Sequence, residues 1–252
     1  MTDLDLQFER ALSYLNTQEY QKSLGIFEFL RDQKYPDPKL DDYLGLNCHF
    51  LGQLKKALVY YQCYSQTAVA KNDILFFNNL GLLYQDLKSF KSAEKSFLRA
   101  LELGLTPNQC FHIRKNLNAL YCETNQYRLR LPLIKSLYQF EPNPLYILEL
   151  ASCFFKLRDY LQAQKLFTEY LHLPSSKIHP KTQFEVQISL ARCLLEMGDL
   201  SASLRALSQS GTFFEPLLNW VGMLWVPIFF ASKAERQFYL DQWSETLKRS
   251  QR

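Results

Sequence analysis

Six cysteines and four histidines are the residues of this 252-residue sequence best suited to hold a metal or to carry out catalysis, and their spacing fits neither role. No CxxC pair occurs, and no set of histidines accompanies the cysteines in the spacing of a zinc site. Sequence motifs for a nucleophilic serine, a phosphate-binding loop, a dinucleotide site or a zinc protease are also missing. We therefore predict no catalytic residue, no metal site and no cofactor. The residues concerned are Cys48, Cys63, Cys110, Cys122, Cys153, Cys193, His49, His112, His172 and His179.

The cellular compartment is indicated by the cysteines and by the first residues. Without a disulfide framework, the six thiols are expected to be free and buried in a reducing compartment. The N-terminal stretch MTDLDLQFERAL has acidic residues where a signal peptide needs a basic start. The apolar stretch 213–230 is interrupted by Glu215, Pro216, Asn219 and Pro227, which argues against a membrane span. The sequence predicts a cytoplasmic protein with no membrane partner.

Charged residues give little indication of a ligand. The chain has 29 basic and 25 acidic residues, a formal net charge of +4, and the two signs are mixed along it. This balance gives no reason to expect a nucleic-acid partner. The acidic pair Asp41 and Asp42 is interpreted as charge at a helix N-terminus rather than as a catalytic pair.

An internal repeat organises most of the sequence. The pattern Leu80-Gly81, Tyr84, Ala93, Phe97 recurs 36 residues upstream as Leu44-Gly45, Cys48, Ala57, Tyr61. Six copies of a unit of about 34 residues can be aligned, each with two helical runs joined by a short polar turn such as LKSF at 87–90. The copies lie near 4–37, 38–71, 74–107, 111–144, 144–177 and 184–210.

Small residues recur at one position in each of the two helical runs. They let the two helices of a hairpin approach closely, which explains a glycine in a helix interior that costs about 1 kcal/mol relative to alanine. The large apolar residue four places after the second small residue is expected to fill the gap to the neighbouring repeat. The first position holds Ala11, Gly45, Gly81, Ala151 and Ala191, and the second holds Ser23, Ala57, Ala93, Ala163 and Ser203.

This period and pattern resemble the tetratricopeptide repeat. The resemblance implies an all-α, right-handed solenoid of six helix-turn-helix repeats over residues 4–210, followed by a capping or junction segment at 211–252. Two departures carry expectations. Asn118 and Arg130 occupy the small positions of the fourth repeat, so that hairpin is expected to be splayed or bent, and a slightly extended helix or a loop is expected at 174–183.

Amide side chains mark a candidate peptide-binding surface on the first helices. Asn79 and Asn116 stand two residues before the small position of their repeats, with Asn47, Asn78 and Lys115 nearby. An amide can donate to a peptide carbonyl and accept from a peptide N–H. The arrangement resembles the asparagine ladder of the repeat region in protein O-GlcNAc transferases, which implies an extended protein segment as partner. The alternative is a merely polar inner face.

The last forty residues suggest a further relationship. The segment 226–247 contains Pro227, then the β-like run Ile228-Phe229-Phe230, then Ser232 and Glu235 before a helix expected to end near Leu247. It resembles the junction between the repeats and the catalytic half in bacterial SPINDLY-type O-GlcNAc transferases. Trp220, Trp225, Phe229 and Phe230 would then form a docking surface for a separate or missing glycosyltransferase domain. The alternative is a capping helix that seals the stack. Two hypotheses therefore remain open: the non-catalytic substrate-recognition part of such an enzyme, or a stand-alone cytoplasmic adaptor or chaperone.

Overall fold

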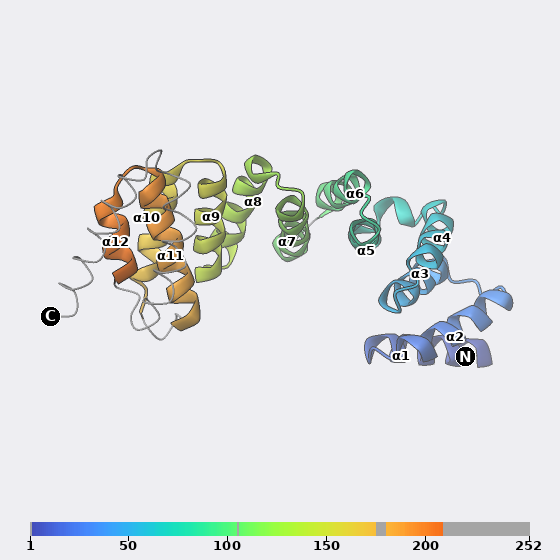
Figure 1. The fold of residues 1–252 in the computed structure, drawn as a ribbon. Coiled ribbons are helices and arrows are strands. Elements are labelled where there is room, and N and C mark those ends of the chain that lie inside the picture. Colours follow the sequence, from blue (N-terminus) through green and yellow to red (C-terminus); the bar gives the residue numbers. More distant parts are fainter. Residues whose placement is uncertain (1, 105, 175–179, 209–252) are drawn as a thin grey trace. The chain divides into compact units, whose positions relative to one another are not determined.

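Every regular element that the structure describes is a helix. The computed structural model describes residues 2–104, 106–174 and 180–208, which form two compact units. The unit up to Gln126, the N-terminal unit, contains α1 (Asp3–Asn16), α2 (Tyr20–Asp32), α3 (Leu40–Phe50), α4 (Leu54–Ser65), the short 3-10 helix η1 (Ala70–Asn72), α5 (Ile74–Asp86), α6 (Phe90–Leu103) and α7 (Pro107–Glu123) (Figure 1). The C-terminal unit contains α8 (Tyr127–Phe140), α9 (Pro144–Lys156), α10 (Tyr160–Leu171), α11 (Pro180–Glu196) and α12 (Leu200–Ser208). The all-α prediction is confirmed for these residues.

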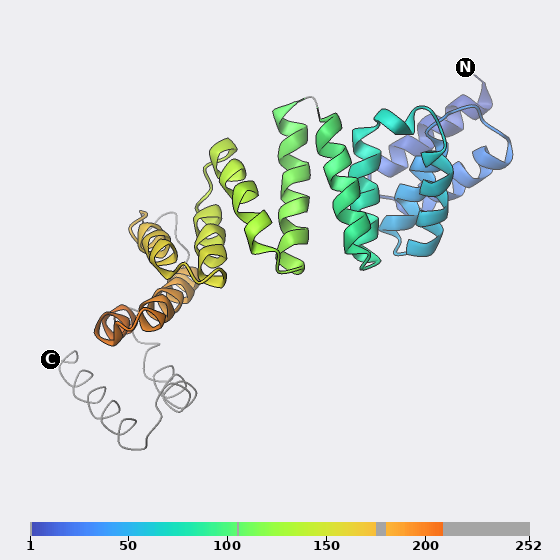
Figure 2. The ribbon, with the colours of Figure 1, turned by 90° about the horizontal axis from the view of Figure 1, so that it is seen from above.

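Consecutive helices pair as antiparallel hairpins within each unit. The pairs α1–α2, α3–α4 and α5–α6 pack together in the N-terminal unit, and α9–α10 and α11–α12 do so in the C-terminal unit (Figures 1 and 2). The second helix of one hairpin then packs on the first helix of the next, as α2 does on α3 and α10 on α11.

The turn after each first helix is the same in all six repeats. One residue of the turn adopts a positive φ. The backbone N–H of the residue after it donates to the carbonyl oxygen five residues earlier, so one of the last carbonyl groups of the helix has a hydrogen-bond partner. In the third repeat this bond joins Ser89 N to Tyr84 O at 2.8 Å. The positive-φ residues of these turns are Gln18, Gly52, Lys88, Asn125, Arg158 and Gly198. The recurrence of one turn explains why the two small positions are 12 residues apart in every repeat, as they are in Gly81 and Ala93.

Two glycines inside helices, Gly45 of α3 and Gly81 of α5, make room for aromatic rings. A Cβ added to Gly45 would lie 2.4 Å from Tyr61 Cδ1, and one added to Gly81 would lie 2.6 Å from Phe97 Cδ1. Both rings are fully buried. The predicted close approach is therefore confirmed for these hairpins. Each ring packs on the glycine of its own hairpin, and the Tyr61 ring also reaches the next repeat as expected, with its centre 5.7 Å from that of Phe76.

A serine joins the two helices in the first and sixth hairpins. Ser23 Oγ donates to Ala11 O at 3.0 Å, and Ser203 Oγ donates to Ala191 O at 2.8 Å. Both serines are buried. Because the small position leaves the facing carbonyl within reach, the hydroxyl can bond across the hairpin where alanine cannot.

The variant Ser23→Ala is expected to lower the free energy of unfolding by about 1 kcal/mol, because it removes a buried hydrogen bond. Urea unfolding followed by circular dichroism measures this change. Ser13→Ala is the control, since Ser13 is exposed on α1. Equal effects of the two substitutions would contradict the role given to the buried bond.

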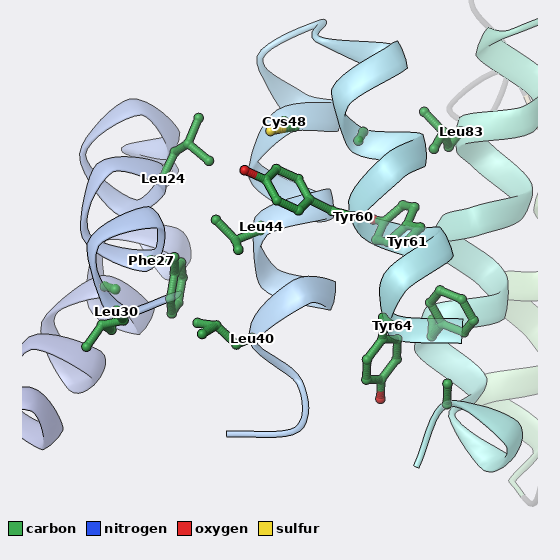
Figure 3. Packing of buried hydrophobic residues seen from close by; sticks show 14 of the residues in the cluster. Leu24, Phe27, Leu30, Leu40, Leu44, Cys48, Tyr60, Tyr61, Tyr64 and Leu83 are labelled. Carbon is green, nitrogen blue, oxygen red and sulfur yellow. The ribbon is translucent and has the colours of Figure 1, made fainter. Parts of the chain in front are cut away.

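The core of the N-terminal unit is continuous from α1 to α5. Figure 3 shows Phe27 and Leu30 of α2 facing Leu40 and Leu44 of α3. The same cluster continues through α4 into α5, where the ring of Phe76 meets that of Tyr64 with centroids 4.9 Å apart. Each hairpin thus buries the face that its neighbour leaves open.

An arginine replaces the small residue in the fourth repeat and is buried against α9. Arg130 is 7% exposed, and its Nη2 lies 2.7 Å from Glu149 Oε2. Its Nη1 lies 3.6 Å from Cys153 Sγ. Because α7 and α8 belong to different units, the expected splay of this hairpin stays a prediction.

The connection before the sixth repeat is described only in part. Residues 175–179 lie outside the described residues, and α11 begins at Pro180. Residues 180–183 therefore belong to a helix, as the expected extended helix requires. With 17 residues, α11 is also longer than α9, which has 13. The division into an array at 4–210 and a segment at 211–252 stays a prediction.

Candidate functional site

Two helices that carry predicted asparagines, α5 and α7, begin at a side-chain cap. Asp73 accepts a hydrogen bond from Phe76 N and thereby starts α5. Thr106 and Gln109 form a capping box at the start of α7, where Pro107 occupies the first turn. These caps fix where α5 and α7 begin and therefore which residues share a face.

A hydrogen bond joins the amides of α5 and α7. Asn116 Nδ2 donates to Asn78 Oδ1 at 2.8 Å, and both side chains are partly buried. Asn78, not Asn79, is therefore the neighbour of Asn116, although Asn79 and Asn116 occupy equivalent places in the repeat. Asn79 is also partly buried on α5. The bond leaves the NH₂ group of Asn78 and the Oδ1 of Asn116 to offer one donor and one acceptor from neighbouring helices.

Further polar contacts join the first helices of successive hairpins. Asp86 Oδ2 of α5 lies 2.7 Å from His49 Nε2 of α3, and Gln85 Nε2 donates to Glu123 Oε2 of α7 at 2.8 Å. Lys88 Nζ also bonds Glu123 at 2.6 Å, and these donors lower the pKa of the Glu123 carboxyl. These contacts make the surface polar at the last turns of α3, α5 and α7.

Two other predicted residues lie in different surroundings. Asn47 is fully buried, and its Nδ2 donates to Tyr43 O at 2.8 Å. It corrects the expectation of a surface residue, because a side chain without exposed area cannot reach a ligand. Lys115 is exposed, with its Nζ 5.5 Å from the centre of the Phe111 ring. The predicted docking residues Trp220, Trp225, Phe229 and Phe230 lie outside the described residues.

A buried acidic residue beside this surface was not foreseen. Asp42 lies in the first turn of α3, as interpreted from the sequence, but it is only 6% exposed, and its Oδ1 has no hydrogen-bond partner in the described part of the chain. Burial, reinforced by the negative charge of Asp73, raises the pKa of Asp42 to about 7. The only sequence signal is position, since Asp42 precedes Asn78 by the repeat offset of 36 residues.

Asp73 lies in the same region but is well satisfied. Its Oδ2 accepts from Lys39 Nζ at 2.7 Å and from the Tyr64 hydroxyl at 2.9 Å. Burial alone would raise the pKa of Asp73, but the bonds from Lys39, Phe76 N and Tyr64 outweigh it and lower that pKa. Asp73 therefore stays charged, which explains its effect on Asp42.

Among the described residues, no group of three or more histidine, cysteine or carboxylate side chains is placed to hold a metal ion. All six cysteines are free; Cys48, Cys153 and Cys193 are buried as expected, whereas Cys63 and Cys122 are exposed, which corrects the prediction for those two. No described helix has the length and apolar character that crossing a bilayer requires.

Within each unit the described helices form hairpins that pack on one another. A family model described as tetratricopeptide repeat matches residues 76–103, the third hairpin. The hairpins have the tetratricopeptide-repeat fold, which generally serves as a non-catalytic scaffold for protein–protein interaction. A search of curated proteins finds no match.

Several solved structures share this fold. The C-terminal part of a tetratricopeptide repeat-containing protein from Cytophaga hutchinsonii matches with TM-score 0.66 and 13% identity, over 95% of this chain and 88% of that one. A chain of the Naa15/Naa10 complex bound to HypK-THB matches with TM-score 0.65 and 18% identity, over 98% of this chain and 36% of that one. YrrB, described as having an unusual peptide-binding site, matches with TM-score 0.57 and 14% identity, over 73% of this chain and 90% of that one.

Proposed function

We propose that this chain is a protein-binding scaffold whose N-terminal unit holds an extended peptide segment against α5 and α7. The observation that supports this proposal is the bond between Asn116 and Asn78, which presents an amide donor and an amide acceptor from adjacent helices. An extended backbone offers a carbonyl and an N–H in alternation, so each amide finds a complementary partner without reading a side chain. Asn79 supplies a third amide on the same helix as Asn78.

The surroundings support the same kind of ligand. Lys115 lies beside Asn116 on α7 and is exposed, so it can pair with an acidic side chain or a terminal carboxylate of the bound segment. The polar contacts among His49, Asp86, Gln85 and Glu123 hold the first helices together beside the amides. A surface that is already organised loses little conformational entropy when a peptide binds.

The double variant Asn79→Ala plus Asn116→Ala tests this proposal. Twelve-residue peptides are first selected on the full chain from a random display library, and their Kd values are then measured by isothermal titration calorimetry. Loss of two hydrogen-bonding side chains is expected to raise Kd roughly tenfold or more.

The matched control is Gln62→Ala plus Asn108→Ala, which removes two exposed amides from α4 and from the first turn of α7. The control is expected to leave Kd unchanged, and both variants should keep the helical circular dichroism spectrum. Unchanged peptide affinity in the Asn79 and Asn116 variant would remove the amides from the proposed site.

The finer hypothesis of a glycosyltransferase-associated repeat region rests on the segment 226–247, which lies outside the described residues. The similar proteins named above give it no support. The proposal is therefore limited to a scaffold for a protein segment, and YrrB, with its described peptide-binding site, shares the fold.

A further inference from the structure

A second candidate surface lies on the α5–α6 hairpin, and none of the predicted asparagines lines it. It is a groove of about 750 Å³ whose apolar floor is formed by Phe77, Leu80 and Tyr84 of α5. These three residues are spaced by three and four positions, so they share one face of the helix. All three are only partly buried. Leu98 of α6, which is 42% exposed, extends the apolar surface at the edge of the groove.

The groove stays open because the preceding hairpin covers α5 incompletely. The residues between α4 and α5 contain η1, and α4 packs on α5 less extensively than α2 packs on α3 or α6 on α7. Arg99 fixes the position of η1 by donating to Lys71 O at 3.3 Å. The apolar face of α5 is therefore left partly uncovered where another second helix would shield it.

The side of α6 that borders this groove is basic. Lys91, Lys95 and Arg99 line the groove and follow one another at intervals of four residues, which places them in a row along the helix. Lys91 and Lys95 are exposed and form no ion pair within the described part of the chain. Arg99 is bonded to Glu102 at 3.0 Å and stands over the Phe77 ring, with its Cζ 5.9 Å from the ring centre.

The two acidic residues of the groove are already engaged. Glu94 Oε1 accepts a hydrogen bond from the Tyr121 hydroxyl of α7 at 2.7 Å, and Glu102 accepts from Arg99. The groove therefore presents an apolar floor beside two ammonium groups that pair with no described carboxylate. A ligand with acidic side chains can pair with these groups while its apolar side chains cover the floor.

We propose that the groove formed by Phe77, Leu80, Tyr84, Lys91, Lys95 and Leu98 binds an acidic protein segment that carries large apolar residues. The apolar side chains of the segment lie on the α5 floor, and its carboxylates pair with Lys91 and Lys95. The charge complementarity selects against basic segments, and the floor selects against acidic segments without apolar residues. This site uses none of the amides of the proposed peptide-binding surface, so the two can be tested separately.

Fluorescence anisotropy with a labelled peptide tests the proposal on the full chain. The probe is the peptide EELFDELLEEFD, and the comparison peptide has serine in place of each leucine and phenylalanine, which keeps the charge. We expect the probe to bind and the serine peptide to bind at least tenfold more weakly. Raising the salt from about 50 mM to about 300 mM is expected to weaken probe binding several-fold, since exposed charges are screened.

Two variants locate the binding. Lys91→Glu plus Lys95→Glu reverses the charge of these two side chains and is expected to raise the Kd of the probe by roughly tenfold or more. Ser92→Trp is expected to abolish binding by filling the groove, because Ser92 is exposed and lines it. Lys55→Glu plus Lys165→Glu is the matched control, as it makes the same charge change at positions on α4 and α10 outside the groove.

If the Lys91 and Lys95 variant and the control lost affinity for the probe equally, net charge alone would explain the loss, and the proposal would be overturned. Equal binding of the probe and the serine peptide would also overturn it, as would equal binding of a twelve-residue oligothymidylate, because either result indicates a general anion surface. Unchanged binding by Ser92→Trp, with an unaltered unfolding midpoint, would place the peptide elsewhere.

Discussion

Replacing Asp42 by asparagine is expected to raise the free energy of unfolding at about pH 8 by roughly 2–4 kcal/mol. The reason is that Asp42 is ionised at this pH although it is buried and one of its oxygens has no hydrogen-bond partner in the described part of the chain. An uncharged amide of nearly the same shape avoids most of the cost of burying a charge. Urea unfolding at a series of pH values measures the difference between the two proteins.

The pH dependence gives the sign of the effect. The pKa of Asp42 is about 7 in the folded protein, above its ordinary value of 3.8. Between these two values the folded state holds a proton that the unfolded state has released, so stability falls as pH rises through this window. The advantage of the asparagine variant should be small at about pH 4, grow towards pH 7 and then level off.

The groups around Asp42 set this behaviour and define the control. The charged and titratable neighbours that act on it, or on which it acts, are Asp73, Lys39, Tyr43, Tyr61 and Tyr64. Asp41→Asn is the matched control, since the Asp41 carboxylate is partly exposed and accepts from Arg31 Nε at 2.8 Å. The control is expected to change stability by less than about 1 kcal/mol. Parallel pH profiles for Asp42→Asn and the parent protein would contradict the assignment.

The hairpins could be predicted because small residues recur in register. Gly81 and Gly45 are separated by the repeat offset, and the structure places a buried ring over each. The same offset contained a warning about Asn47 that was missed. Asn47 precedes Leu83 by 36 residues, and Leu83 is fully buried, so an asparagine at this position belongs to the core whatever its polarity suggests.

Side-chain pairing could not be predicted from the repeat. Equivalent positions suggested that Asn79 and Asn116 act together, yet Asn116 bonds Asn78. Which of two adjacent residues meets the next helix depends on the rotation between hairpins, and a sequence period does not specify that rotation. The charge state of Asp42 was hidden for a related reason, because a carboxylate in the first turn of a helix is ordinarily solvated there.

Replacing Gly81 by alanine is expected to lower the free energy of unfolding by about 2 kcal/mol, even though alanine is the better helix former by about 1 kcal/mol. The added Cβ would lie 2.6 Å from both Cδ1 and Cε1 of Phe97. The ring is rigid and has no exposed area, so either the ring or the α5–α6 hairpin must shift. Denaturant unfolding of the full chain measures the loss.

Gly25→Ala is the matched control, because Gly25 lies inside α2 and a Cβ added there would have no neighbouring atom within 4 Å. There the helix propensity acts alone, and stability is expected to rise by about 0.5–1 kcal/mol. The double variant Gly81→Ala plus Phe97→Leu should recover part of the loss, since the smaller side chain relieves the overlap. Stabilisation by Gly81→Ala, or strictly additive effects in the double variant, would show that this glycine is not kept for the ring. Opposite signs for the same substitution in two helices would show that close packing, not helix propensity, decides where this repeat requires glycine.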